Sequence, residues 1–244
     1  MKMQILSSLL LFAVISCNST TSENQVAAET SEVVVQSGGS ITVKAFDLKM
    51  KLPGVQILDV RTAGEFQGGH FKNALQANWL NEGEFAERVQ YIDKAKPVLV
   101  YCASGVRSEE AMNWMKQNGF QDVNNLKGGL SAWRMEGMPL ETKAARAEIS
   151  IAAFKASTKT GTILVDIGAE WCPPCVKMEP VLQQLQKEKG AQFNLVKVDG
   201  GIDITVMKEL RSEGLPTFIV FKNGKEVWRK QGLVDLPTLS KAIE

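Results

Sequence analysis

Residues 171–175 read Trp-Cys-Pro-Pro-Cys, and they come shortly after an apolar run, residues 163–167, that predicts a buried strand. Apolar residues then recur at helical spacing from Met178 onward, so Cys172 is expected at a strand-to-helix junction. The helix dipole favours negative charge there, which lowers the pKa of a thiol and makes a thiolate available. The spacing also lets the two sulfurs form a disulfide. We therefore predict that Cys172 attacks and that Cys175 resolves.

A zinc half-site is the alternative interpretation of two cysteines at this spacing. Such a site needs a second Cys/His pair, and the sequence offers none: its only histidine, His70, is far away along the chain. We therefore expect a redox-active pair, no metal and no cofactor.

Composition favours a globular protein with two domains of ordinary size. The 244 residues are 44% hydrophobic and 23% charged, which is typical of folded chains. The formal net charge is +1, so nothing indicates nucleic acid or an anionic membrane surface as a partner.

The first sixteen residues predict a signal peptide. A short apolar stretch follows Lys2 and ends at residues 14–17, Val-Ile-Ser-Cys, which resemble a bacterial lipobox. The resemblance implies acylation of Cys17 and a lipid anchor on the periplasmic side of the cell envelope. By the same resemblance, Asn18 after the cysteine, rather than Asp, implies the outer membrane rather than the inner one. The alternative is an ordinary signal peptide cleaved elsewhere. Residues 17–40 lack a sustained apolar period and predict a flexible tether.

Residues 41–142 alternate strand-like and helix-like segments, which predicts an α/β domain with a largely parallel sheet. Cys102 ends a strand, and in such sheets ligands bind at the carboxyl ends of strands. The clearest elements are strands at residues 55–60 and 97–102 and helices at 84–92 and 108–118.

A short loop after Cys102 is a candidate anion cradle, because backbone amides in such a loop can curl around one point. A sulfur at its centre would be stabilised as a thiolate or a persulfide. Arg107 would add positive charge at the rim, and Ser108 is expected to cap the following helix. The loop residues are Ala103, Ser104, Gly105 and Val106.

Several motifs in this segment resemble the rhodanese (sulfurtransferase) family in order and spacing. The resemblance implies that Cys102 accepts a sulfane sulfur from a donor such as thiosulfate or polysulfide and passes it to a nucleophile. His70 is expected to be structural, and Arg61 is expected to form an ion pair with Glu65. The motifs are Asp59-Val60-Arg61, Glu65-Phe66, Gly69-His70, residues 102–108 and residues 126–133.

Three other interpretations of Cys102 are open. Tyrosine-phosphatase-like and arsenate-reductase-like loops also place Cys and Arg around an anion, but with five intervening residues in the phosphatases. Here residues 103–106 are four, and the smaller loop suits a sulfur atom better than a phosphoryl group. Cys102 could also be an inert buried thiol, or the domain could bind a partner or sulfur compound without turnover.

Residues 143–244 predict a second α/β domain, in which Asn223-Gly224 between two apolar runs is a strong hairpin signal. The expected strands are at residues 162–168, 193–198, 217–221 and 226–230. The expected helices begin near residue 147, run from the cysteine pair to about 189, span 203–213, and begin again at 236.

This segment resembles thioredoxin. The resemblance implies a cis bond before Pro216, with Pro216 and Trp171 beside the bound substrate. It also implies that a buried Asp166 exchanges a proton with Cys175. Residues 173–174 are Pro-Pro where many thioredoxins have Gly-Pro, and these positions tune the redox potential. No histidine lies between the cysteines, which favours a reductant. The matching motifs are residues 165–166, 169–175, Pro180, 215–217 and 221–224.

The sequence thus predicts a rhodanese-like parallel-sheet domain followed by a thioredoxin-fold domain. We expect a periplasmic thiol-disulfide oxidoreductase, working as a reductase, with a sulfurtransferase site that forms a persulfide. Its expected partners are a protein disulfide or persulfide and a small sulfane-sulfur donor, with the lipid anchor as its sole membrane contact and no nucleic acid. A scaffold lipoprotein without a redox role is the remaining alternative.

Overall fold

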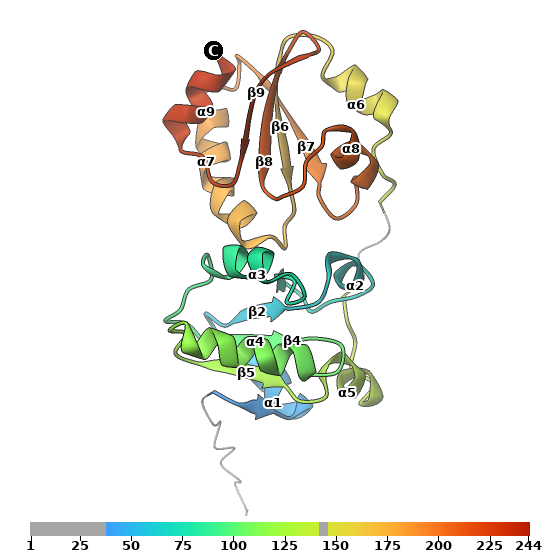
Figure 1. Ribbon diagram of the computed structural model, residues 1–244, viewed down its shortest axis with the longest axis vertical. Helices are drawn as coiled ribbons and strands as arrows, with labels where there is room; N and C mark the ends of the chain where they lie inside the picture. The colour runs from blue at the N-terminus through green and yellow to red at the C-terminus, as the bar shows by residue number, and fades with distance from the viewer. Residues whose placement is uncertain (1–37, 142–145) are drawn as a thin grey trace, which may run out of the picture. The chain divides into compact units, whose positions relative to one another are not determined.

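The computed structural model describes residues 38–141 and 146–244 (Figure 1). The predicted signal peptide, the predicted acylation of Cys17 and nearly all of the predicted tether lie outside these residues. Within the described ranges, no helix is both long enough and apolar enough to cross a bilayer.

The first domain is built on a five-stranded sheet in the order β1-β5-β4-β2-β3, and all of its strands run parallel. This confirms the predicted parallel α/β architecture. The strands are β1 Ser40–Ile41, β2 Gln56–Asp59, β3 Leu75–Gln76, β4 Val98–Tyr101 and β5 Val123–Leu126. The helices are α1 Val43–Met50, α2 Ala63–Gln67, α3 Glu82–Val89, α4 Val106–Gln117 and α5 Gly129–Met135.

Strand β4 lies at the centre of this sheet, and its four side chains are fully buried. Parallel strands that are covered on both faces are expected to be continuously apolar, as Val-Leu-Val-Tyr is. Val98 and Val100 pack with Ala111 and Met115 of α4 on one face, and Cys102 belongs to the same cluster. The central strand therefore delivers Cys102 to the start of α4.

The second domain has a mixed four-stranded sheet in the order β7-β6-β8-β9. Strand β6 runs parallel to β7 and antiparallel to β8, and β8 and β9 form the predicted hairpin. The strands are β6 Thr162–Gly168, β7 Asn194–Asp199, β8 Thr217–Lys222 and β9 Lys225–Gln231. The helices are α6 Ile151–Ser157, α7 Pro173–Lys189, α8 Ile204–Glu209 and α9 Leu236–Ile243.

The alternation of side chains along β6 determines which of them face α7, the helix that begins at the cysteine pair. Figure 1 shows α7 and α9 on one face of the sheet and α6 and α8 on the other. Leu164 packs with Met178 and Leu182 of α7, whereas Ile163 and its alternate neighbours face the opposite cluster. Because successive side chains of a strand point to opposite faces, Asp166 is directed toward α7 with Leu164.

Two helix boundaries in this domain differ from the predictions. The first helix begins at Ile151 rather than near 147, because the Ser150 hydroxyl accepts the Ala153 amide and caps the helix. Helix α8 ends at Glu209 rather than 213, since Leu210 caps it and Arg211 adopts a positive φ of 50°.

Candidate active sites

Cys102 is surrounded by hydrogen-bond donors at the carboxyl end of β4. The Gly105 amide donates to its Sγ at 3.1 Å, and the Ser108 hydroxyl donates at 3.4 Å. Burial raises the pKa of the Cys102 thiol, but bonds from Ser108 and from the amides of Ser104 and Gly105 outweigh burial. The pKa therefore lies below its usual value, as a cradle for an anionic sulfur requires.

The predicted role of Ser108 as a helix cap is wrong. Helix α4 begins earlier, with Gly105 as the N-cap residue at a left-handed φ of 92°. Ser108 lies inside the first turn, which directs its hydroxyl to the Cys102 sulfur instead of to a helix amide.

The start of α5 packs against the loop that follows Cys102. The Leu130 amide donates to the Cys102 carbonyl and the Ser131 amide to the Ala103 carbonyl, both at 2.9 Å. Gly129 has a φ of 56°, and a Cβ added there would lie 2.5 Å from the Cys102 carbonyl oxygen. Only glycine permits this approach, and Gly129 was not among the residues predicted to form the site.

Gly129→Ala is expected to move the loop and raise the pKa of Cys102, because the donors around its sulfur shift. The pKa is measured by the pH dependence of alkylation of the Cys102 peptide. The free energy of unfolding should fall by about 1–3 kcal/mol. Gly54→Ala is the matched control, since Gly54 also has positive φ (77°) but open space around its Cβ position. An equal effect of both substitutions on the alkylation profile would contradict this role of Gly129.

Arg107 is fixed by Glu65 in a two-pronged ion pair, with Nη2 2.7 Å from Oε1 and Nη1 3.0 Å from Oε2. The Arg107 guanidinium is the main reason that the pKa of Glu65 is lowered to about 2. The predicted Arg61–Glu65 pair is wrong: Arg61 binds Asp59 instead, with Nη2 2.6 Å from Oδ2. Both members of that pair are buried, whereas α2 carries Glu65 to the rim of the cysteine loop.

His70 has a structural environment, as expected. Its Nδ1 lies 2.9 Å from the Phe66 carbonyl oxygen, and its ring stacks on the Phe66 ring.

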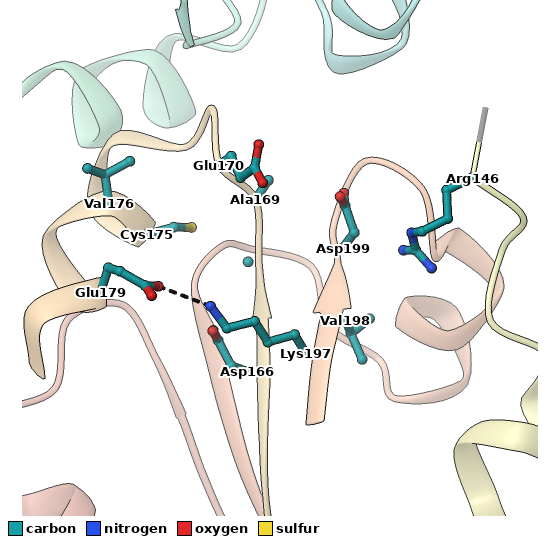
Figure 2. A pocket seen from close by; sticks show the side chains of 11 residues that line it. Arg146, Asp166, Ala169, Glu170, Cys175, Val176, Glu179, Lys197, Val198 and Asp199 are labelled. Atoms are coloured by element: carbon teal, nitrogen blue, oxygen red, sulfur yellow. Dashed lines mark hydrogen bonds and ion pairs between the residues drawn. The ribbon is translucent and has the colours of Figure 1, made fainter. Parts of the chain in front are cut away.

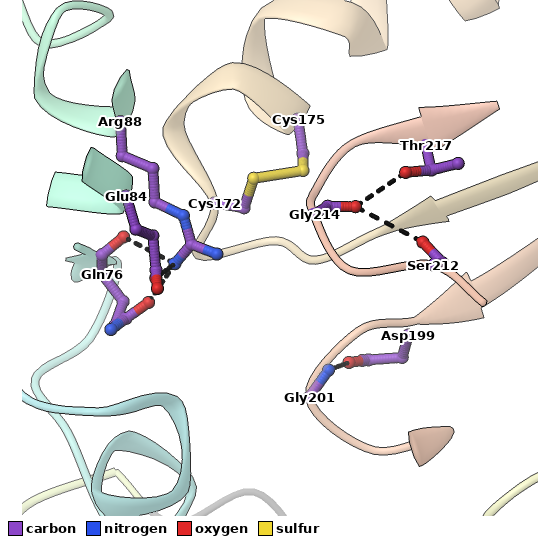
Figure 3. The surroundings of a disulfide bond; sticks show 10 residues. All are labelled: Gln76, Glu84, Arg88, Cys172, Cys175, Asp199, Gly201, Ser212, Gly214 and Thr217. Atoms are coloured by element: carbon purple, nitrogen blue, oxygen red, sulfur yellow. Dashed lines mark hydrogen bonds and ion pairs between the residues drawn. A yellow bond between two sulfur atoms is a disulfide. The ribbon is translucent and has the colours of Figure 1, made fainter. Parts of the chain in front are cut away.

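The second site lies at the start of α7. Cys172 is its N-cap residue and is joined to Cys175 in a disulfide with a Cα–Cα distance of 5.2 Å (Figure 3). The two prolines fill the first turn, where amide hydrogens have no helical partner. The cysteine predicted to attack therefore sits where the helix dipole favours a thiolate.

The loop before β8 belongs to the surroundings of this disulfide, as Figure 3 shows for Gly214 and Thr217. The Leu215–Pro216 bond between them is cis, which confirms the expectation for Pro216. The Thr217 hydroxyl donates to the Gly214 carbonyl at 2.7 Å and fixes the loop. Trp171 lies against Gly201, where an added Cβ would be 3.1 Å from the indole Cζ2.

Asp166 and Cys175 line a cavity of about 510 Å³ (Figure 2). A Cβ added at Gly168 would lie 3.3 Å from Asp166 Oδ1 and 3.5 Å from Cys175 Sγ. Glycine therefore keeps a small space open between the Asp166 carboxyl and the Cys175 sulfur. Burial raises the pKa of Asp166 to about 6, so its carboxylate is a stronger base than an exposed one.

The structure thus gathers the predicted residues into two constellations. In the first domain these are Cys102, residues 103–106 and Arg107. In the second domain they are Trp171, Cys172, Cys175, Asp166 and Pro216. Sequence reasoning missed Glu65 as the partner of Arg107, and it missed Gly129, Gly168, Glu179 and Lys197. Only Glu179 had a local signal, because it follows Cys175 by one helical turn.

Comparisons with known proteins agree with this division. Residues 42–136 match the family described as Rhodanese-like domain, and residues 146–244 match Thioredoxin. Thioredoxin of Chlamydia trachomatis serovar D is 39% identical over 90 residues, which are 37% of this chain and 87% of that protein.

Two further relatives are matched over smaller parts of their own length. Thioredoxin Y, chloroplastic, of Oryza sativa subsp. japonica is 39% identical over 82 residues, 34% of this chain and 49% of the relative. The tRNA uridine(34) hydroxylase of Cytophaga hutchinsonii is 39% identical over 84 residues, 34% of this chain and 27% of the relative. The chain thus covers about half of the first and about a quarter of the second.

The chain thus combines a rhodanese-like domain with a thioredoxin domain that carries a disulfide at a helix N-terminus. The chain belongs to the thioredoxin family, and its thioredoxin domain follows a rhodanese-like domain.

Proposed function

We propose that this protein is a thiol-disulfide oxidoreductase, acting as a reductase, with a sulfurtransferase site that forms a persulfide on Cys102. The observation that carries the sulfur-transfer part is the ring of donors around Cys102 Sγ, with the thiol pKa lowered despite burial. A thiolate there can attack a sulfane sulfur, and the same donors stabilise the negative charge of the resulting persulfide.

The disulfide exchange uses Cys172, Cys175 and Asp166. In the reduced protein the Cys172 thiolate attacks a partner disulfide, forming a mixed disulfide and releasing one partner thiolate. Cys175 then gives its proton to the Asp166 carboxylate and attacks Cys172 Sγ. The bond to the partner breaks, the second partner sulfur leaves with the electron pair, and Asp166 returns the proton. The protein is left with the Cys172–Cys175 disulfide.

The sulfur transfer uses Cys102. With thiosulfate as donor, the Cys102 thiolate attacks the sulfane sulfur, the donor S–S bond breaks, and sulfite leaves with the electron pair. An acceptor thiol then attacks the outer sulfur of the persulfide and regenerates the Cys102 thiolate. If the acceptor is the reduced Cys172–Cys175 pair, Cys172 takes the sulfur, Cys175 attacks Cys172, and sulfide is released as the disulfide closes.

The proposed location is the periplasmic side of the cell envelope, with a lipid on Cys17 and the outer membrane favoured. It rests on the apolar N-terminal stretch and the lipobox-like residues 14–17. The proposed partners are a protein disulfide or persulfide and a small sulfane-sulfur donor. At this location a reductase would need a thiol carrier to reduce the cysteine pair again.

Intact mass spectrometry tests the proposed sulfur transfer and the proposed lipid anchor. The sample is the whole chain, purified from envelopes in detergent with Cys172 and Cys175 reduced. After thiosulfate or polysulfide, Cys172→Ser should gain about 32 Da, the mass of one sulfur, on Cys102. The unsubstituted chain should release sulfide instead. No adduct from either donor would indicate that the rhodanese-like domain binds a partner or a sulfur compound without transferring sulfur. The same spectrum reports acyl chains on Cys17, and their absence would contradict the lipid anchor.

A further inference from the structure

The cavity beside Asp166 contains an ion pair that the proposed reaction leaves unused. Glu179 follows Cys175 by four residues on α7, so both lie on the same helix face. Lys197 on β7 is the parallel register partner of Asp166, so the two side chains leave the sheet side by side toward α7. Glu179 and Lys197 both line the cavity (Figure 2).

The Lys197 ammonium is bound by Glu179 rather than by Asp166. Lys197 Nζ lies 3.1 Å from Glu179 Oε2, and Figure 2 shows the ammonium directed at that carboxylate. Among the residues that the structure describes, no ion pair joins Lys197 to Asp166. The two paired side chains are 57% and 47% exposed, so the pair contributes little to stability and its effect is on the neighbouring carboxyl.

We propose that Glu179 is a positioning residue of the disulfide-exchange site: by binding Lys197 it keeps that ammonium from pairing with the Asp166 carboxylate, which stays basic enough to take the proton of Cys175. This inference rests on the proposed thiol-disulfide function and adds a residue to it. The proton step itself is unchanged: the Cys175 S–H bond breaks and an Asp166 O–H bond forms.

The charges around Asp166 have the signs that this role needs. Burial is the main cause that raises the pKa of Asp166, the positive charge of Lys197 lowers it, and the negative charge of Glu179 raises it. On β8, the residue opposite Asp166 is Phe218, which carries no charge. The remaining charged groups that line the cavity are Arg146, Glu170 and Asp199; Arg146 binds Asp203 at 2.7 Å.

The test is a titration of the Asp166 carboxyl carbon by NMR in the oxidised whole chain. Glu179→Gln should lower the pKa of Asp166 by roughly one unit, because its negative charge is lost and Lys197 is free to approach. Lys197→Met should raise the pKa. Glu188→Gln is the matched control: it removes the same charge later on α7, at a residue outside the cavity lining, and should leave the Asp166 titration unchanged.

Kinetic measurements of disulfide exchange test the role of Glu179 in a second way. In Glu179→Gln the acid limb of the pH profile for release of a mixed disulfide should move to lower pH. The rate at neutral pH should fall roughly threefold, since a weaker base is a poorer proton acceptor. An unchanged Asp166 titration in Glu179→Gln, with active unsubstituted protein, would overturn the role of Glu179. Absence of disulfide exchange in the unsubstituted protein would instead overturn the proposed function, while the titration still reports on the ion pair.

Discussion

Replacement of Cys172 by serine is expected to reduce disulfide cleavage by this protein to the uncatalysed background. Cys172 caps the N-terminus of α7, where the helix dipole stabilises a thiolate, and a serine hydroxyl is not ionised there at neutral pH. Cys175→Ser should behave differently, because the attack still occurs but the mixed disulfide cannot be resolved. The measurements are reduction of insulin disulfides with an external dithiol, and mass spectrometry of the trapped partner.

Cys102→Ser is the control for both variants, since Cys102 lies at the end of β4 in the other sheet. It should retain insulin reduction and lose the release of sulfide from thiosulfate that the unsubstituted chain should show. Residual insulin reduction by Cys172→Ser would show that another thiol makes the first attack, and it would contradict the assignment of roles within the pair.

Asp166→Asn is expected to stabilise the protein at neutral pH and to slow its resolving step. Folding raises the pKa of this carboxyl from 3.8 to about 6, so the folded state binds more protons than the unfolded state between these values. Stability therefore falls as the pH rises through this window, and above it the buried carboxylate costs about 3 kcal/mol. The asparagine variant removes this cost at pH 7. Well below pH 3.8 the Asp166 carboxyl is neutral in both the folded and the unfolded state, so the gain from the substitution disappears.

Urea unfolding at pH 7 and below pH 4 measures this difference. The expected gain is about 2–3 kcal/mol at pH 7. Single-turnover release of a mixed disulfide should slow by at least about a hundredfold, because Cys175 loses its proton acceptor. Asp235→Asn is the control: Asp235 caps α9 from the surface, asparagine caps equally well, and stability should change little. An equal gain at both pH values would indicate better packing rather than the removal of a buried charge.

The local motifs could be predicted well because their signals lie in short stretches of chain. The apolar runs before Cys102 and Cys172 give strands β4 and β6 within a residue of the predicted bounds. Each apolar run is followed directly along the chain by a turn and then by the first residues of a helix. The whole strand-turn-helix unit is therefore visible in one short stretch of sequence. The end of α8 could not be read in this way, because Arg211 leaves the helix without a glycine or proline to mark the point.

The sequence by itself determined the two domain types, the cysteine pair, the cysteine loop and the position of Asp166 on a strand. Only the tertiary structure decided the partners of the charged and small residues. Arg107 binds Glu65, 42 residues away, rather than leaving Glu65 to Arg61. Gly129 packs closely against the Cys102 carbonyl, and Lys197 binds Glu179 rather than Asp166. The physical reason is that these contacts join distant segments, and their distances depend on how helices stack on the sheets rather than on spacing along the chain.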